Sequence, residues 1–119
     1  MTKNKNVVED FINGFSNTKT KHLFIENKQE VLILYSYGYH FPLSIKLLDN
    51  TFLINLNGYS NTTARHKGLL CYALINLNFK QLEKGIKEHN NIMLFDTNQL
   101  KSIIEKGFKN KFEIIQNKI

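Results

Sequence analysis

Four apolar runs of strand length follow one another along the chain, and only short polar breaks separate them. Connections this short join antiparallel neighbours, because parallel strands need a crossover of about a dozen residues or more. The breaks also carry turn-forming residues such as Gly38 and Asn50. The pattern predicts a β-meander over residues 22–56, with strands at about 22–26, 30–37, 39–47 and 51–56.

The third run alternates apolar and polar residues, which predicts a strand with one buried face and one wet face. Its buried face would hold Phe41, Leu43, Ile45 and Leu47. Pro42, the only proline of the chain, has no N–H to donate to a neighbouring strand. We therefore expect this run to lie at an edge of the sheet or at a β-bulge.

Helical spacing of apolar residues flanks the meander on both sides. Residues 1–17 predict a short amphipathic helix, and residues 60–107 predict a helical half that contains one strand. Within that half we expect helices at about 62–76 and 79–89, a strand at 92–95, and a helix that runs from a capping box at Asp96 and Gln99 to Gly107. Residues 108–119 predict either a final strand or a basic tail.

Together these elements predict an α+β fold that forms a single domain over residues 1–119. An antiparallel meander sheet of four or five strands would carry the helices packed on one of its faces. Two domains in a chain of 119 residues would each have too little interior to be stable alone. Apolar residues make up 42% of the chain, and this share excludes a disordered protein.

The composition also limits the compartment and the cofactors. The longest nearly apolar run, residues 68–77, is much shorter than the roughly 18 residues that cross a bilayer, so we expect no membrane association. The N-terminus reaches Glu9 and Asp10 before a long apolar stretch begins, unlike a secretory signal, and we expect a cytoplasmic protein. The single Cys71 is expected in the core. We expect no metal and no cofactor.

Cations occupy the start of the predicted helix at 62–76, where the helix dipole disfavours positive charge. Arg65 and Lys67, with the titratable His66 between them, fall in its opening turns, and residues 50–82 contain no acid. Because acids are the side chains that such a helix start prefers, this conflict indicates an anion as the missing partner.

We expect a phosphate-binding corner at this helix start, with nucleic acid as the partner. The side chains that would contact phosphate are Ser60, Thr62, Thr63, Arg65, His66 and Lys67. Neighbouring polar or stacking contacts would come from Tyr37, His40 and Tyr59. The alternative is a helix that is simply capped by Ser60 or Thr62, with Arg65 and Lys67 projecting into water.

His40 and His66 allow a second interpretation. Two imidazoles beside a cation are the minimum set for metal-independent cleavage of RNA, since one can take the 2′-hydroxyl proton while the other protonates the leaving oxygen. The alternative is a structural hydrogen-bonding role for both rings. We favour a non-enzymatic protein, in which no residue is catalytic.

Two wider patterns bear on partners. Tyr35, Tyr37, Tyr39 and Phe41 alternate, and on an unbroken strand they would share a face that either stacks on bases or packs in the core. The chain has 16 basic and 10 acidic residues, and its excess of positive charge lies almost wholly after residue 60. Such a basic half suits a polyanion or an acidic protein surface, and solvated lysines are the alternative.

Two polar segments resemble a family known as a domain of unknown function in bacteriophage and mobile-element proteins. Its members carry an SYGxHFP segment and, about twenty residues further on, a GYSxTTxRH segment. This chain has SYGYHFP at residues 36–42 and GYSNTTARH at residues 58–66. The resemblance implies a small phage-type protein in the host-cell cytoplasm, of the kind that acts in host takeover or against host defence.

The favoured function is therefore that of a non-enzymatic phage-type accessory protein that binds RNA or an RNA-guided nucleoprotein. An inhibitor of a CRISPR effector (an anti-CRISPR protein) is one form of it. The alternatives are a metal-independent ribonuclease that uses His40 and His66, and a protein-only inhibitor whose binding surface is the lysine-bearing helices. Self-association into a homo-oligomer is compatible with each of them.

Overall fold

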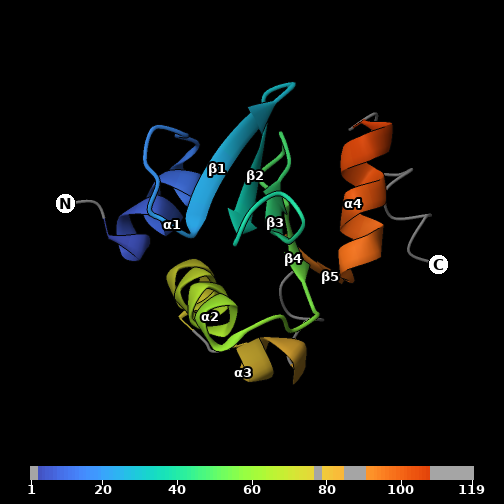
Figure 1. Cartoon of the computed structure of the whole chain (residues 1–119). Helices are drawn as coiled ribbons and strands as arrows, with labels where there is room; N and C mark the ends of the chain where they lie inside the picture. Colours follow the sequence, from blue (N-terminus) through green and yellow to red (C-terminus); the bar gives the residue numbers. More distant parts are fainter. Residues whose placement is uncertain (1–2, 77–78, 85–90, 108–119) are drawn as a thin grey trace.

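The fold is α+β, as expected, and it contains a five-stranded sheet with helices packed against it (Figure 1). The computed structural model describes residues 3–76, 79–84 and 91–107. In chain order the elements are α1 (Asn4–Asn13), β1 (Leu23–Lys28), β2 (Val31–Ser36), β3 (Pro42–Lys46), β4 (Phe52–Asn55), α2 (Asn61–Ile75), α3 (Phe79–Lys84), β5 (Ile92–Phe95) and α4 (Thr97–Lys106).

The sheet has the strand order β1-β2-β3-β4-β5. Its first four strands form the expected antiparallel meander. The fifth strand lies parallel to β4, so the sheet is mixed rather than wholly antiparallel. The physical reason is the long connection between β4 and β5, which contains α2 and α3 and returns the chain to the end of the sheet where β4 begins.

A β-bulge interrupts the pairing of β2 with β3 at Pro42. Leu34 faces Ser44 across the two strands, whereas Tyr35 faces Pro42, so β3 carries one extra residue at this point. Because β3 lies inside the sheet, the bulge and not an edge position accommodates the missing N–H of the proline.

The bulge also makes the expected single buried face of the third run wrong. Phe41 and Leu43 lie in the core on the α1 and α2 side of the sheet, whereas Ile45 and Leu47 lie in the core on the α4 side. An extra residue moves every later side chain to the opposite face, since side chains alternate along a strand. Ser44, expected on a wet face, is fully buried and donates a hydrogen bond to the carbonyl of Leu53 (2.8 Å).

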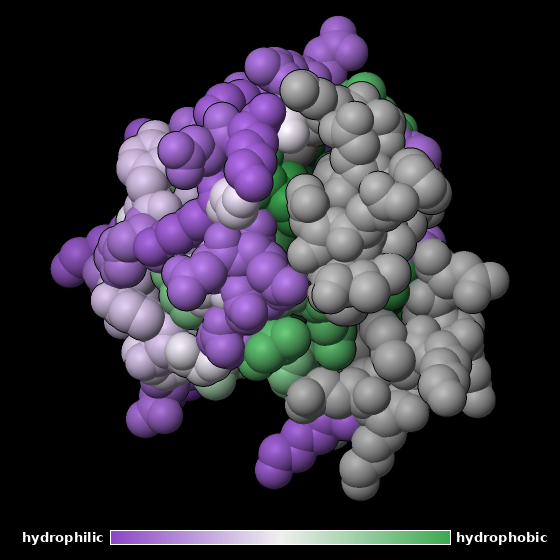
Figure 2. Space-filling view, turned by 90° about the vertical axis from the view of Figure 1, so that its right-hand side faces the viewer, coloured by the Kyte–Doolittle hydropathy of each residue, from purple (hydrophilic) through white to green (hydrophobic). Residues whose placement is uncertain are grey.

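Helices cover both faces of the sheet, not one face as expected (Figure 1). Every residue of β2 is buried, so this strand has no wet face and requires cover on both sides. Leu32 and Leu34 pack towards α1 and α2, and Ile33 and Tyr35 pack towards α4. Figure 2 faces the α4 side and shows mainly hydrophilic residues on the described part of that surface, next to a smaller hydrophobic area.

The remaining elements lie close to their predicted places. The first helix is confined to Asn4–Asn13, and the capping box at Asp96 and Gln99 opens α4 as expected. The predicted helix at 79–89 is described as far as residue 84, and residues 108–119 lie outside the described part. Cys71 is buried in the core, and burial raises the pKa of its thiol to about 11. No helix in the described part is long and apolar enough to cross a membrane.

Candidate functional site

The two polar segments at 36–42 and 58–66 meet in space, although strands β3 and β4 separate them in sequence. The first segment turns sharply after β2, because Tyr37 and Gly38 both adopt left-handed backbone angles (φ 69° and 104°). The amide of Phe41 donates to the carbonyl of Gly38 (3.3 Å), which closes the turn. The reversal points this segment towards the N-terminal end of α2.

The second segment ends in the N-cap of α2. Ser60 has an extended backbone, and its Oγ accepts a hydrogen bond from the amide of Thr63 (3.1 Å). Just before it, the carbonyl of Asn57 accepts a hydrogen bond from Lys67 Nζ (2.8 Å), and the side chain of Asn57 accepts one from the amide of Thr97 (2.7 Å). The start of α2 is therefore held to its own second turn and to α4.

A line of hydrogen bonds, buried at its centre and half-buried at its two ends, joins α2 to the end of β2, to α1 and to the loop before β1. Ser36 Oγ lies 3.0 Å from Thr63 Oγ1 and 2.8 Å from His66 Nδ1. On the other side of the ring, Asn4 Nδ2 lies 3.2 Å from His66 Nε2, and Thr20 Oγ1 donates to Asn4 Oδ1 (2.6 Å). We call Ser60, Thr63, Ser36, His66, Asn4 and Thr20 the polar line.

The contacts of His66 assign its tautomer. The oxygen of the Asn4 amide accepts from Thr20, so its nitrogen faces His66 and donates to Nε2. The ring therefore carries its proton on Nδ1 and donates it to Ser36. Burial lowers the pKa of His66, and the nearby His22 lowers it further. The imidazole is neutral at pH 7, and both of its nitrogens are engaged.

Four aromatic rings form a continuous series beside the start of α2, and we call them the aromatic row: His22, Tyr37, Tyr59 and His40. His22 stacks on Tyr37 with 4.3 Å between ring centroids, and Tyr37 lies 5.9 Å from Tyr59. His40 meets the edge of Tyr59 at 5.3 Å, and its Nε2 lies 2.9 Å from the Tyr59 hydroxyl. Tyr59 is 54% exposed and His40 is also exposed.

The residues of the expected phosphate corner fall into two groups. Arg65 is exposed, and Thr62 and Ser60 are half-buried near it. Thr63, His66 and Lys67 are buried. Lys67 neither meets solvent nor projects from the helix start, because its ammonium binds Asn57 and lies 4.1 Å from the centre of the Phe79 ring.

The two histidines of the ribonuclease interpretation have separate partners. His40 contacts Tyr59 at the surface, and His66 contacts Ser36 and Asn4 in the interior. Only 1% of His66 is exposed, so its ring has no face to offer a substrate. The described residues also contain no group of three side chains that could hold a metal ion.

The alternating tyrosines are divided between three environments. Tyr35 is buried, stacks on Phe24 and lies near Glu26, and burial and the carboxylate raise its pKa. Phe41 lies in the opposite core, and Tyr39 is 65% exposed. The left-handed backbone of Tyr37 ends the alternation, so the four rings share no common face.

Sequence reasoning found Tyr37, His40 and Tyr59, which the structure brings together, but missed Ser36, His22, Asn4 and Thr20. The sequence offered one indication of the Ser36–His66 contact, namely that each residue lies in one of the two polar segments. It offered no indication for Asn4 and His22, because their contacts depend on the packing of α1 and on the path of the loop before β1. No family model matches the chain, and no curated protein and no solved structure matches it.

Proposed function

We propose that this protein is a non-enzymatic binding protein that contacts single-stranded RNA through the aromatic row and Arg65. The observation that carries the proposal is the continuous series of four rings from three chain segments, two of them well exposed. Rings at a surface bind unpaired bases by stacking, and every base offers a face for this contact.

Arg65 supplies the charge that a phosphate backbone requires. It lies on α2, whose cap Ser60 directly follows Tyr59, and its guanidinium is exposed. The net charge of +6 favours a polyanion over an acidic small molecule at long range. Thr63, His66 and Lys67 are no part of the proposed surface, since they are buried and hydrogen-bonded inside the protein.

The state of His66 supports binding rather than cleavage. A general acid or base must reach the reacting atoms, and this ring is buried, neutral and occupied on both nitrogens. His66 therefore cannot be the second proton carrier that the mechanism with His40 and His66 requires.

The phage-type setting that the two polar segments led us to expect extends the proposal. A small protein that binds single-stranded RNA can occupy the guide or the exposed strand of an RNA-guided nucleoprotein and thereby inhibit it. We propose this anti-defence role, as an anti-CRISPR protein, as the biological setting of the same surface.

Binding is tested by fluorescence anisotropy with a labelled single-stranded RNA at two salt concentrations. Tyr59→Ala should weaken binding by a factor of about 5 to 150, since one base–ring stack is worth about 1–3 kcal/mol. Arg65→Ala should weaken binding and lower the salt slope by about one unit. The matched controls are Tyr72→Ala, a tyrosine 64% exposed about two turns further along α2 than Arg65, and Lys101→Ala, an exposed cation on α4.

The proposal fails if wild type does not bind RNA, or if the controls lose as much affinity as the two site variants. The ribonuclease alternative is tested with the same labelled RNA. Labelled RNA incubated in EDTA should stay intact with wild type, whereas cleavage that His40→Ala abolishes would establish the enzyme instead.

A further inference from the structure

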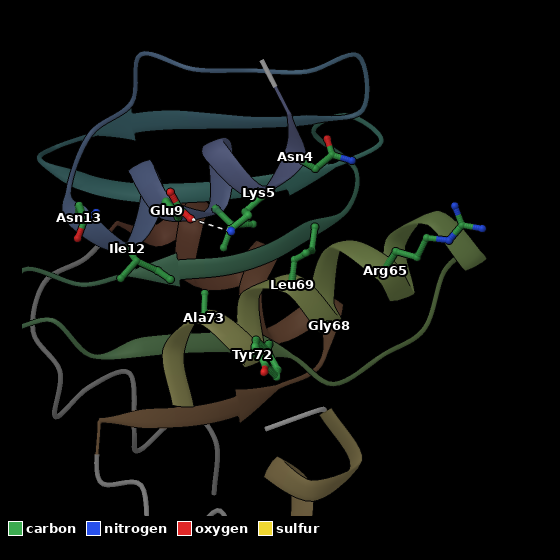
Figure 3. Close-up of a pocket in the computed structure, with 11 residues that line it drawn as sticks. Asn4, Lys5, Glu9, Ile12, Asn13, Arg65, Gly68, Leu69, Tyr72 and Ala73 are labelled. Atoms are coloured by element: carbon green, nitrogen blue, oxygen red, sulfur yellow. Dashed lines mark ion pairs between the residues drawn. The ribbon is translucent and has the colours of Figure 1, made fainter. Parts of the chain in front are cut away.

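An open groove of about 870 Å³ lies between α1 and α2 (Figure 3), and no ring of the aromatic row lines it. Its walls are mainly apolar, and they include Val8 and Ile12 from α1 and Leu69 and Ala73 from α2. Tyr72, 64% exposed, and Leu69, 36% exposed, are large side chains that the fold leaves partly uncovered here. A surface of this kind is typical of a docking site.

Gly68 lies in the middle of α2 and lines the groove. A glycine inside a helix costs about 0.5–1 kcal/mol relative to alanine. The fold does not require it, because a Cβ at this position would meet no atom within 4 Å and the backbone there is ordinary helix. The missing side chain instead leaves room for a chain from outside to approach the helix closely.

The two ends of the groove differ in charge. Figure 3 shows Asn4 and Arg65 at one end, and Ile12, Asn13 and Ala73 towards the other. Arg65 is exposed, and Lys5 is bound only loosely to Glu9 (4.0 Å, both side chains well exposed). The end beside Arg65 is therefore complementary to negative charge.

We infer that this groove binds one amphipathic helix of a partner protein, with acidic side chains at the end that lies against Arg65. The apolar face of that helix would cover Leu69 and Tyr72, and its closest approach would be at Gly68. The 10 residues of α1 offer a wall about 15 Å long, which fits two to three turns of a helix. The inference shares Arg65 with the proposed RNA surface but uses none of the aromatic row, so it can be tested apart from RNA binding.

The probe is a displayed library of helix-biased peptides, about four turns long, selected against the folded protein. Enriched peptides should carry apolar residues three and four apart, with acids towards one end. On binding they should shift the amide NMR signals of Val8, Ile12 and Leu69. Gly68→Leu should weaken binding at least about tenfold, because it fills the point of closest approach.

The matched control is Ala64→Leu, which adds similar bulk to an exposed position of the same helix outside the groove, and it should bind like wild type. A separate control shows that the groove variants are folded: Gly68→Ala should raise the melting temperature. Basic enriched peptides, equal binding by Gly68→Leu, or a concentration-dependent dimer that Gly68→Leu dissociates would each overturn the inference.

The two binding proposals share Arg65, and the tyrosine variants distinguish them. Tyr59→Ala should lose RNA and keep the selected peptide, whereas Tyr72→Ala should lose the peptide and keep RNA. If wild type binds RNA but selects no peptide, the groove proposal fails and the RNA proposal stands. If wild type selects a peptide but does not bind RNA, the RNA proposal fails and the groove proposal stands.

Discussion

Ser36 Oγ accepts a hydrogen bond from His66 Nδ1 at 2.8 Å, and both residues are almost wholly buried. This contact joins the end of β2 to the second turn of α2. Every buried side-chain nitrogen or oxygen in the described part has a hydrogen-bond partner, so the polar line is complete. Complete buried networks of this kind are costly to disturb at any one member.

Stability should fall as the pH falls below about 6.5, the ordinary pKa of histidine. The pKa of His66 is lowered in the folded protein, so below that pH the unfolded chain binds a proton that the folded chain does not. His66→Gln should flatten this part of the pH profile. Urea denaturation between pH 5 and pH 8 measures it, and a slope that His66→Gln leaves unchanged would contradict the prediction.

Ser36→Ala should destabilise the fold by about 1–3 kcal/mol, because it leaves the buried Nδ1–H of His66 without its acceptor. Urea denaturation at pH 7 gives the free energy of unfolding. Ser102→Ala, on the half-buried side of α4, is the matched control and should change it by less than about 0.5 kcal/mol. If Ser36→Ala lowers the free energy of unfolding no more than Ser102→Ala does, the polar line contributes little to stability.

Cys71 should resist thiol reagents while the protein is folded. Its side chain is buried and its pKa is about 11, so the reactive thiolate is scarce at pH 8. Absorbance with a disulfide reagent should show labelling that is slow in buffer and fast in urea. Rapid labelling in buffer would contradict the burial of this residue.

Gly38→Ala should cost about 1–2 kcal/mol, since the backbone there is left-handed and the added Cβ would lie 3.4 Å from the His40 ring. Gly58→Ala is the matched control, because a Cβ at residue 58 would meet nothing within 4 Å. Thermal unfolding should show a lower melting temperature for the first variant and little change for the second.

Local patterns predicted much of this fold. The capping box at Asp96 and the meander follow from short-range chemistry, and both are confirmed. The division of Leu43 and Ile45 between two cores was not predicted. Pro42 indicated either an edge or a bulge, but the alternation was continued through it unchanged, and only the bulge reverses the faces. The burial of Lys67 was not predicted, because a lysine near the start of a helix is ordinarily expected to be exposed to solvent. Its acceptor, the carbonyl of Asn57, is set by the path of the chain into α2.

The bond between Asn4 and His66 has a mechanical consequence for the two helices that it joins. It ties the N-terminal end of α1 to α2 beside Arg65, whereas Asn13 and Ala73 lie towards the opposite end of the groove (Figure 3). The groove therefore has one clamped end and one end held by side-chain packing. The end beside Arg65 therefore fixes the spacing of the two helices through a directional contact, whereas the Ala73 end fixes it through the shape of the packed side chains.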